Sequence, residues 1–339
     1  MARFTLVTLG MVALLVLAIA MGSPFAGLAL AYVTAFTFLM DRLNTPKTPD
    51  NAASEFPSGD GLAATLGLLH FPLLFGGVWA IGGDSALEML DRILLFVALS
   101  LYLGQVSNSN AHELIHRAPR WMRRLGAANY ASILYGQHAS AHLHVHHVHA
   151  ATPRDPNSAA LGEGFYRYLM RAWLGELREG FRAETRRHKN RPLQHPYLGY
   201  AVGGAAALFL SYVLAGLGGL AAFWGLCLYA QAQLMLSDYV QHYGLRRRET
   251  APGKWAPVGP EHSWNAPHPF SSALMLNAPR HSDHHARPST AYPGLTINRD
   301  TMPILPHSLP VMAVLALVPP VWRRLMDKRA RKWAALGAN

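Results

Sequence analysis

Six long apolar stretches constrain the fold of this 339-residue chain more than any other feature of its sequence. They cover residues 4–21, 24–40, 61–81, 87–105, 197–217 and 220–239. A helix needs about 20 apolar residues to cross a bilayer, and each stretch is close to that length. Only 14% of the residues are charged, compared with about 25% in typical soluble domains. The sequence therefore predicts an all-α membrane protein with six transmembrane helices.

The boundaries between neighbouring stretches are short in two places. Gly22 and Ser23 alone separate the first two stretches, which predicts a tight helical hairpin. The last two meet at Gly218 and Gly219 inside one long apolar run. The first stretch has an alternative interpretation as a signal peptide, because Arg3 precedes it and small residues follow it.

The basic residues predict which side of the membrane the loops occupy. Thirteen of the 30 Lys and Arg residues lie between the fourth and fifth stretches, and thirteen more follow the sixth. Cytoplasmic loops carry an excess of Lys and Arg, so segments 107–196 and 240–339 are predicted to be cytoplasmic. They would form a helix-rich head on a single integral-membrane domain covering residues 1–339. The net charge of +11 then reflects topology, and we expect no binding to nucleic acid.

Composition points to histidine as the residue that carries chemistry, since the chain has 18 copies of it and a single cysteine. One cysteine excludes a disulfide framework and a thiolate metal cluster. The segment "NSNAHELIHRAPR" contains His112 and His116, which a helix places on the same face. This HExxH pattern alone is typical of a zinc protease with Glu113 as general base.

A second cluster lies in "YGQHASAHLHVHHVHAATPRDP" and contains His138, His142, His144, His146, His147 and His149. Helical spacing places three of them, His142, His146 and His147, on one face. The same i, i+4 rule also offers His138, and spacing does not choose among them. A histidine-rich metal-storage tract is an alternative interpretation of this segment.

Two further segments complete the set. "SDYVQHYGLRRR" contains His242, and "RHSDHHARP" contains His281, His284 and His285 at i, i+3 and i+4. One zinc ion needs three or four ligands, so nine candidates and a tenth in reserve fit two transition-metal ions. Imidazole suits iron, zinc and copper, which leaves the metal open. A transporter or sensor would favour polar groups inside the spans, where His70 is nearly alone.

The motifs "HELIHR", "HLHVHHVHAATPRDPNSAALGE", "DYVQHYGLRR", "HSWNAP" and "LNAPRHSDHHARP" occur in an order that resembles one family. This is the membrane-bound alkane monooxygenase (AlkB-type) family, within the integral-membrane di-iron hydroxylase and fatty acid desaturase superfamily. The resemblance covers nearly the whole chain. It implies that two iron ions are bound by His112, His116, His142, His146, His147, His242, His281, His284 and His285. It passes over His138, His144 and His149.

The resemblance also implies an activity. It is that of a non-haem di-iron monooxygenase hydroxylating a terminal C–H bond of an alkane or alkyl chain, with O2 and two electrons from rubredoxin. Rubredoxin reductase would reduce the rubredoxin, and the site would face the cytoplasm from a bacterial inner membrane. Related reactions are alternatives: xylene-type methyl hydroxylation, fatty-acyl desaturation and oxidative decarboxylation. An intramembrane zinc protease using His112, Glu113 and His116 is a further alternative. The oligomeric state is left open.

Two departures from the family pattern affect residues beside the ligands. Ala141 replaces a usual Glu, and Asp238 and Gln241 replace a usual Asn and Glu. Carboxylates that contact ligating imidazoles orient them and raise their basicity. Glu113, Asp238 and Asp283 are therefore candidates for this role, and the departures put the substrate in question.

The substrate pocket and the redox partner are predicted from simple physical requirements. An alkyl chain from lipid has no polar group, so its binding must depend on shape and packing in an apolar pocket. We expect walls from the first four stretches, with Phe36, Phe38 and Leu69 as examples. The Arg-rich cytoplasmic face is expected to attract an acidic rubredoxin.

Overall fold

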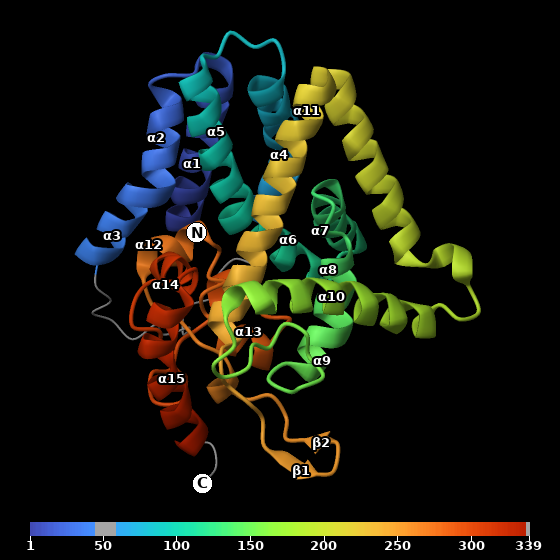
Figure 1. The fold of residues 1–339 in the computed structure, drawn as a ribbon, viewed down its shortest axis with the longest axis vertical. Helices are drawn as coiled ribbons and strands as arrows, with labels where there is room; N and C mark the ends of the chain where they lie inside the picture. The colour runs from blue at the N-terminus through green and yellow to red at the C-terminus, as the bar shows by residue number, and fades with distance from the viewer. Residues whose placement is uncertain (45–58, 337–339) are drawn as a thin grey trace.

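The computed structural model describes residues 1–44 and 59–336. It is mostly helical, and in these residues β1 (Glu249–Ala251) and β2 (Lys254–Trp255) form a small antiparallel hairpin. Figure 1 shows long helices side by side in one half of the molecule and shorter helices crowded in the other. The prediction of an all-α membrane protein is confirmed. The single domain over 1–339 and the cytoplasmic location of 107–196 and 240–339 stay predictions.

Five helices in the described residues are long and apolar enough to cross a membrane. They are α1 (Ala2–Met21), the helix Phe25–Leu43, α4 (Asp60–Gly82), the helix Met89–Ile115 and α11 (Pro196–His242). Two of these contain a π-helical turn. The second consists of α2 (Phe25–Ala31), η1 (Tyr32–Phe36) and α3 (Thr37–Leu43). The fourth consists of α5 (Met89–Tyr102), η2 (Leu103–Ser107) and α6 (Asn108–Ile115). The first four predicted stretches thus correspond to one helix each.

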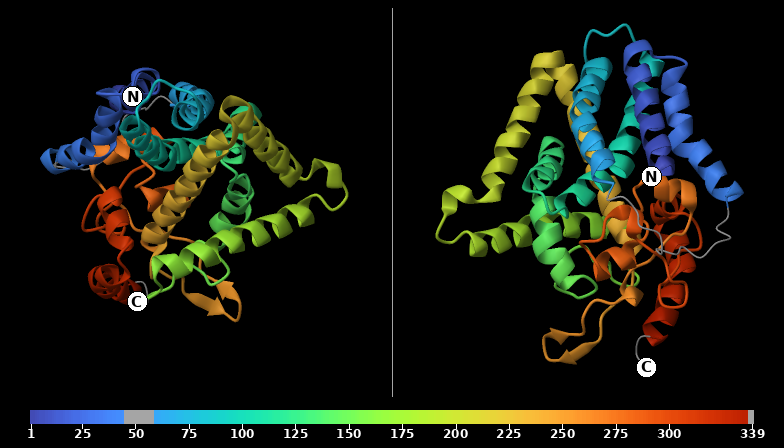
Figure 2. Two further views of the ribbon diagram at one scale, coloured as in Figure 1. Left: turned by 45° about the horizontal axis from the view of Figure 1, so that its top comes forward. Right: turned by 180° about the vertical axis from the view of Figure 1, so that it is seen from behind.

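The fifth and sixth predicted stretches form one helix, α11, with a sharp bend. A straight helix of 47 residues would be about 70 Å long, more than twice the thickness of the hydrocarbon core. The backbone leaves helical geometry at Ala215 (φ −152°, ψ 23°) and Gly216 (φ 56°, ψ −141°). Glycine adopts the positive φ without a Cβ clash. Figure 2 shows the resulting first arm (196–214) and second arm (217–242) diverging from this bend.

Most of the remaining helices lie in the half of the molecule away from that bend (Figure 1). The α- and π-helices are α7 (Arg120–Ser132), α8 (Gln137–Ala141), η3 (His142–His146), α9 (His147–His149), α10 (Phe165–Arg187), α12 (Pro269–Leu274), α13 (His281–Ala286), α14 (Leu309–Ala316) and α15 (Pro319–Leu336). The 3-10 helices are η4 (Pro192–Gln194), η5 (Pro260–His262) and η6 (Tyr292–Gly294).

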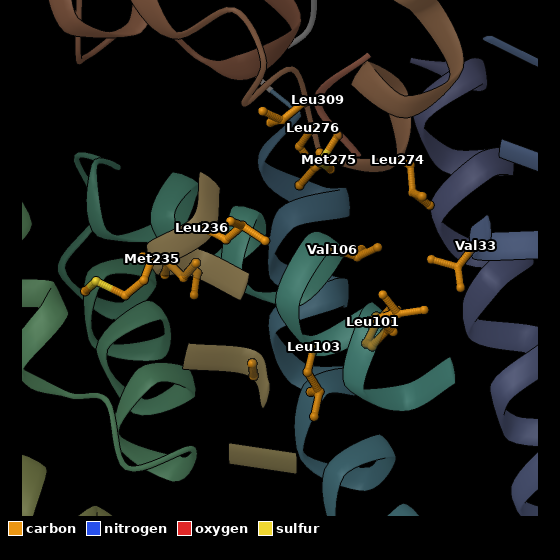
Figure 3. Close-up of a cluster of buried hydrophobic side chains, with 14 of the residues drawn as sticks. Val33, Leu101, Leu103, Val106, Met235, Leu236, Leu274, Met275, Leu276 and Leu309 are labelled. Carbon is orange, nitrogen blue, oxygen red and sulfur yellow. The ribbon is translucent and has the colours of Figure 1, made fainter. Parts of the chain in front are cut away.

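One cluster of buried apolar side chains joins the spans to these shorter helices. Val33 from η1 and Leu101 from α5 belong to it together with Met275 and Leu309, which come from the last third of the chain (Figure 3). Close packing of this kind leaves few voids and resists relative movement. It therefore holds the helix ends that carry the histidines in fixed positions.

Candidate metal centre

Nine histidines meet in two groups where the second arm of α11 and the helix Met89–Ile115 reach the shorter helices. The ligand nitrogens within each group all lie within 4.8 Å of one another. The first group is His112, His116, His142, His147 and His284, and the second is His146, His242, His281 and His285. These are the nine histidines that the family resemblance implies. Among the described residues, neither group includes His138, His144 or His149.

The Nε2 atoms of the first group are spaced as ligands of one ion would be. Nε2 of His142 lies 2.7 Å from that of His112 and 3.1 Å from that of His116. Nε2 of His147 lies 2.9 Å from that of His142 and 3.2 Å from those of His116 and His284. Two nitrogens bound to one ion at about 2.1 Å and at right angles lie about 3.0 Å apart. The five imidazoles therefore fit a transition-metal ion.

The second group shows the same spacing with four imidazoles. Nε2 of His281 lies 2.9 Å from that of His242 and 3.1 Å from that of His285. Nε2 of His146 lies 3.2 Å from that of His285. All four side chains are buried, and the donor set is entirely imidazole nitrogen, which suits iron, copper or zinc.

A π-helical turn decides which histidines of the second motif share a group. The backbone N–H of His147 donates to the carbonyl of His142, five residues earlier. This turn aligns His142 with His147 and directs His146 to the other group. The rings of His142, His146 and His147 do lie together, with centroids 4.5 to 6.0 Å apart, but α-helical spacing did not predict that His146 would join a different group from the other two. The histidines of α13 are also divided: His284 joins the first group, and His281 and His285 join the second.

Burial keeps most of these imidazoles neutral, which is the form that binds metals. Burial, together with the nearby His146, lowers the pKa of His281 to about 3. Burial, together with the neighbouring Arg117, likewise lowers the pKa of His116 to about 3. The site therefore presents neutral nitrogen donors that can accept the positive charge of bound ions.

One carboxylate contacts a ligand of the second group directly. His146 Nδ1 donates to Asp155 Oδ2 at 2.9 Å, and Asp155 also accepts from the Ser158 hydroxyl at 2.6 Å. Burial lowers the pKa of His146, but Asp155 outweighs it and raises this pKa to about 9. A carboxylate in this position fixes the ring and strengthens the opposite nitrogen as a metal donor. Sequence reasoning missed this role, although Asp155 lies in the "ATPRDP" motif.

The three carboxylates predicted to assist the ligands have other partners. Glu113 Oε1 pairs with Arg117 at 2.9 Å and accepts the backbone N–H of Tyr292. Asp283 accepts two hydrogen bonds from the Arg287 guanidinium. Asp238 Oδ2 accepts from Asn157 Nδ2 at 2.7 Å. Their influence on the metals stays a prediction.

Hydrogen bonds from the "HSWNAP" and "DYVQHYGLRR" motifs position α13. Asn265 Oδ1 accepts the backbone N–H of Ser282 at 3.0 Å, and its Nδ2 donates to the Ser282 hydroxyl at 2.7 Å. Gln241 Nε2 donates to the carbonyl of Ala278 at 3.0 Å, three residues before His281. These bonds link the end of α11 to the turn before α13, and Asn265 to α13 itself.

His138 belongs to a separate hydrogen-bonded set beside the first group. Its Nδ1 lies 2.8 Å from Glu176 Oε1, and the Tyr135 hydroxyl donates to the other oxygen of this carboxylate at 2.5 Å. The His138 ring lies 5.3 Å from that of His142, centroid to centroid. Glu176 of α10 thus holds the tenth histidine against a ligand, an arrangement that spacing along the chain did not indicate.

An apolar cavity of about 430 Å³ leads to the metal centre. Its lining includes His112 and His142 from the first group and His281 from the second. Its walls come from the helix Phe25–Leu43, the helix Met89–Ile115, the second arm of α11 and α14. Figure 3 shows five lining residues, Val33, Leu101, Leu236, Met275 and Leu309.

The cavity walls differ from the prediction based on the first four spans. Phe38 lines the cavity, whereas Phe36 and Leu69 lie outside it. Phe36 instead packs against Tyr32 and Phe270. The α11 and α14 helices supply walls that sequence order did not suggest, because both approach the centre only through tertiary packing.

Comparisons with known proteins agree with this geometry. The sequence model of the fatty acid desaturase family matches residues 90–315, a range that contains all nine histidines. Alkane 1-monooxygenase 2 of Pseudomonas aeruginosa is 31% identical over 302 residues, covering 86% of this chain and 79% of the relative. Alkane 1-monooxygenase 1 of the same organism is 32% identical over 312 residues, covering 88% and 81%. The xylene/toluene monooxygenase hydroxylase component XylM of Pseudomonas putida is 28% identical over 286 residues, covering 78% and 73%.

Proposed function

Because this chain belongs to the alkane monooxygenases of the fatty acid desaturase family, we propose that it hydroxylates a terminal C–H bond of an alkane or alkyl chain. The observation that carries the proposal is the pair of imidazole groups, five and four, at the end of an apolar cavity. The reaction would use O2 and two electrons.

Two iron ions are the metals that we propose for the site, with the nine grouped histidines as their ligands. Bound iron would supply the oxidising chemistry with O2, which protein side chains do not provide. Asp155 would hold the His146 ring in place through its Nδ1–H. The bonds from Gln241 and Asn265 would keep α13, and hence His281 and His285, at the required distance.

The cavity would position the alkyl chain and keep water away from the reacting carbon. Leu101, Leu234 and Leu309 are buried and line it, so the chain is held by shape and packing. The first-group ligands His112 and His142 are at its lining as well, which would place a terminal carbon beside that group. A dry site limits side reactions.

The electron donor that we propose is rubredoxin, reduced by rubredoxin reductase. Six basic side chains of α15 are exposed: Arg323, Arg324, Lys328, Arg329, Arg331 and Lys332. Such a surface would steer an acidic protein toward the chain. The positive-inside rule supports a cytoplasmic site on a multi-pass protein of the bacterial inner membrane.

Xylene-type methyl hydroxylation is a second candidate, because the chain is also similar to XylM. A zinc protease is disfavoured by the geometry: His112 and His116 share their group with three further imidazoles, and Glu113 pairs with Arg117.

Product and metal analysis of the purified enzyme tests the proposal. Protein from iron-replete cells, supplied with rubredoxin and its reductase, is expected to contain about two irons per chain and to convert n-octane to a primary alcohol. A desaturated or chain-shortened product as the sole product would refute hydroxylation. One zinc per chain without iron would refute the di-iron site.

A further inference from the structure

Two glutamines line the cavity without a hydrogen-bond partner among the described residues. Gln105 of η2 and Gln233 of the second arm of α11 come from different spans. The Oε1 atom of Gln105 is buried and unpartnered, and no side-chain bond to Gln233 occurs in the described residues. An ideal Cβ on Gly104 would collide with Gln233 Oε1, so this carboxamide lies over the backbone next to Gln105.

The two glutamines lie at similar separations along their helices from a grouped histidine. Gln105 is seven residues before His112 within the continuous helix Met89–Ile115, which corresponds to about 10 Å at 1.5 Å per residue. Gln233 is nine residues before His242 in α11, or about 13 Å. Several other polar groups of the lining are already bonded: Thr37 donates to the Tyr32 carbonyl at 2.7 Å, and Ser237 donates to Gln241 Oε1 at 2.9 Å.

An alkane in this cavity leaves the buried Oε1 atom of Gln105 unpaired and offers no partner to the half-buried Gln233, which opposes its binding. A ligand with an oxygen atom at this depth would instead accept or donate a hydrogen bond. No Lys or Arg lines the cavity in the described part of the chain, whereas Asp238 does. A buried carboxylate without a cation is costly, so the oxygen group would be neutral.

We propose that Gln105 and Gln233 bind a neutral oxygen group, an ester or alcohol, at the distal end of an alkyl chain whose terminal methyl lies at the metal centre. This inference rests on the proposed hydroxylase function and narrows its substrate class. The substrate is then a chain functionalised at one end and oxidised at the other.

Competing substrates of equal chain length test this site in the iron-loaded enzyme with its electron donors. We expect a higher kcat/KM for methyl octanoate than for n-octane, and little turnover of octanoate. Gln105→Met and Gln233→Met should each lower kcat/KM for the ester and raise it for n-octane. The ester-to-alkane ratio should fall about fivefold in each, the effect of one hydrogen bond. Thr65→Val is the matched control, because Thr65 lies outside the cavity and bonds within its own helix.

Ligand binding gives a readout independent of turnover. In lipid nanodiscs, methyl octanoate should raise the Tm of the wild-type protein more than n-octane does, and either glutamine variant should abolish the difference. If the enzyme oxidises n-octane but neither its rate nor its binding favours the ester, the carboxamide site is refuted. The hydroxylase function is then still supported. An equal fall in kcat/KM for both substrates in the variants, at unchanged iron content, also overturns the carboxamide site. Oxidation of neither substrate by the iron-loaded wild type overturns both proposals.

Discussion

The Nδ1 atom of His146 donates to the carboxylate of Asp155 at 2.9 Å. This buried contact joins the second group of histidines to the segment after α9. Ser158 and the backbone N–H of Asn157 also donate to this carboxylate. Burial raises the pKa of Asp155, but His146 and these donors outweigh it and hold the pKa below its usual value. Asp155 therefore stays charged and fixes the ring orientation of one histidine of the second group.

Asp155→Asn should weaken metal binding while keeping the side-chain shape. The change removes the negative charge that strengthens His146 as a donor, and loss of such a partner typically lowers metal affinity about 10- to 100-fold. Titration of metal-depleted protein with Fe(II) against a competing chelator measures the effect. Asp300→Asn, on an exposed turn, is the control; equal affinities in the two variants would refute the role of Asp155.

Replacing one histidine of a group should release the ion of that group and leave the other ion bound. His147→Ala takes a ligand from the first group, and His285→Ala takes one from the second. We expect each variant to retain about one iron per chain instead of two and to lose hydroxylation. His149→Ala is the control, because His149 belongs to neither group. Full metal content in either ligand variant would count against the assignment.

The histidines that meet in the two groups were predictable because histidine motifs are local in sequence. The i, i+4 pairs His112/His116 and His281/His285 each lie within one group, as helical geometry requires. The family resemblance chose among the remaining histidines, and spacing alone had left His138 open. Composition likewise predicted the spans, because apolar length is a direct physical requirement of crossing a bilayer.

The division of the nine histidines between two groups could not be predicted from spacing. The π-turn in η3 shifts alignment from four residues to five, and no residue of "HLHVH" marks such a turn. His146 and His285 are 139 residues apart in the chain, yet their Nε2 atoms lie 3.2 Å apart. Pairings of this kind depend on tertiary packing. The cavity walls that α11 and α14 supply were not predicted, for the same reason.

Gly82→Ala should destabilise the protein by disturbing the bend of α11. An ideal Cβ on Gly82 would collide with the backbone carbonyl of Gly218, just beyond the bend. Backbone cannot move aside as a flexible side chain can, so we expect a loss of about 1–3 kcal/mol. Gly27→Ala is the control, because its Cβ would meet open space within α2. Thermal unfolding in detergent measures both, and an equal Tm for the two variants would contradict the close packing.

Metal removal should make stability depend on pH between about 7 and 5. Burial lowers the pKa of His281 from its ordinary 6.5 to about 3. Over the interval between these values the unfolded chain binds a proton that the folded chain does not, so stability falls as pH falls. For His281 alone this amounts to about 2 kcal/mol at pH 5. Chelator-treated protein should therefore have a lower Tm at pH 5 than at pH 7. His281→Gln should reduce this slope, and a Tm independent of pH would show that the histidines do not carry this linkage.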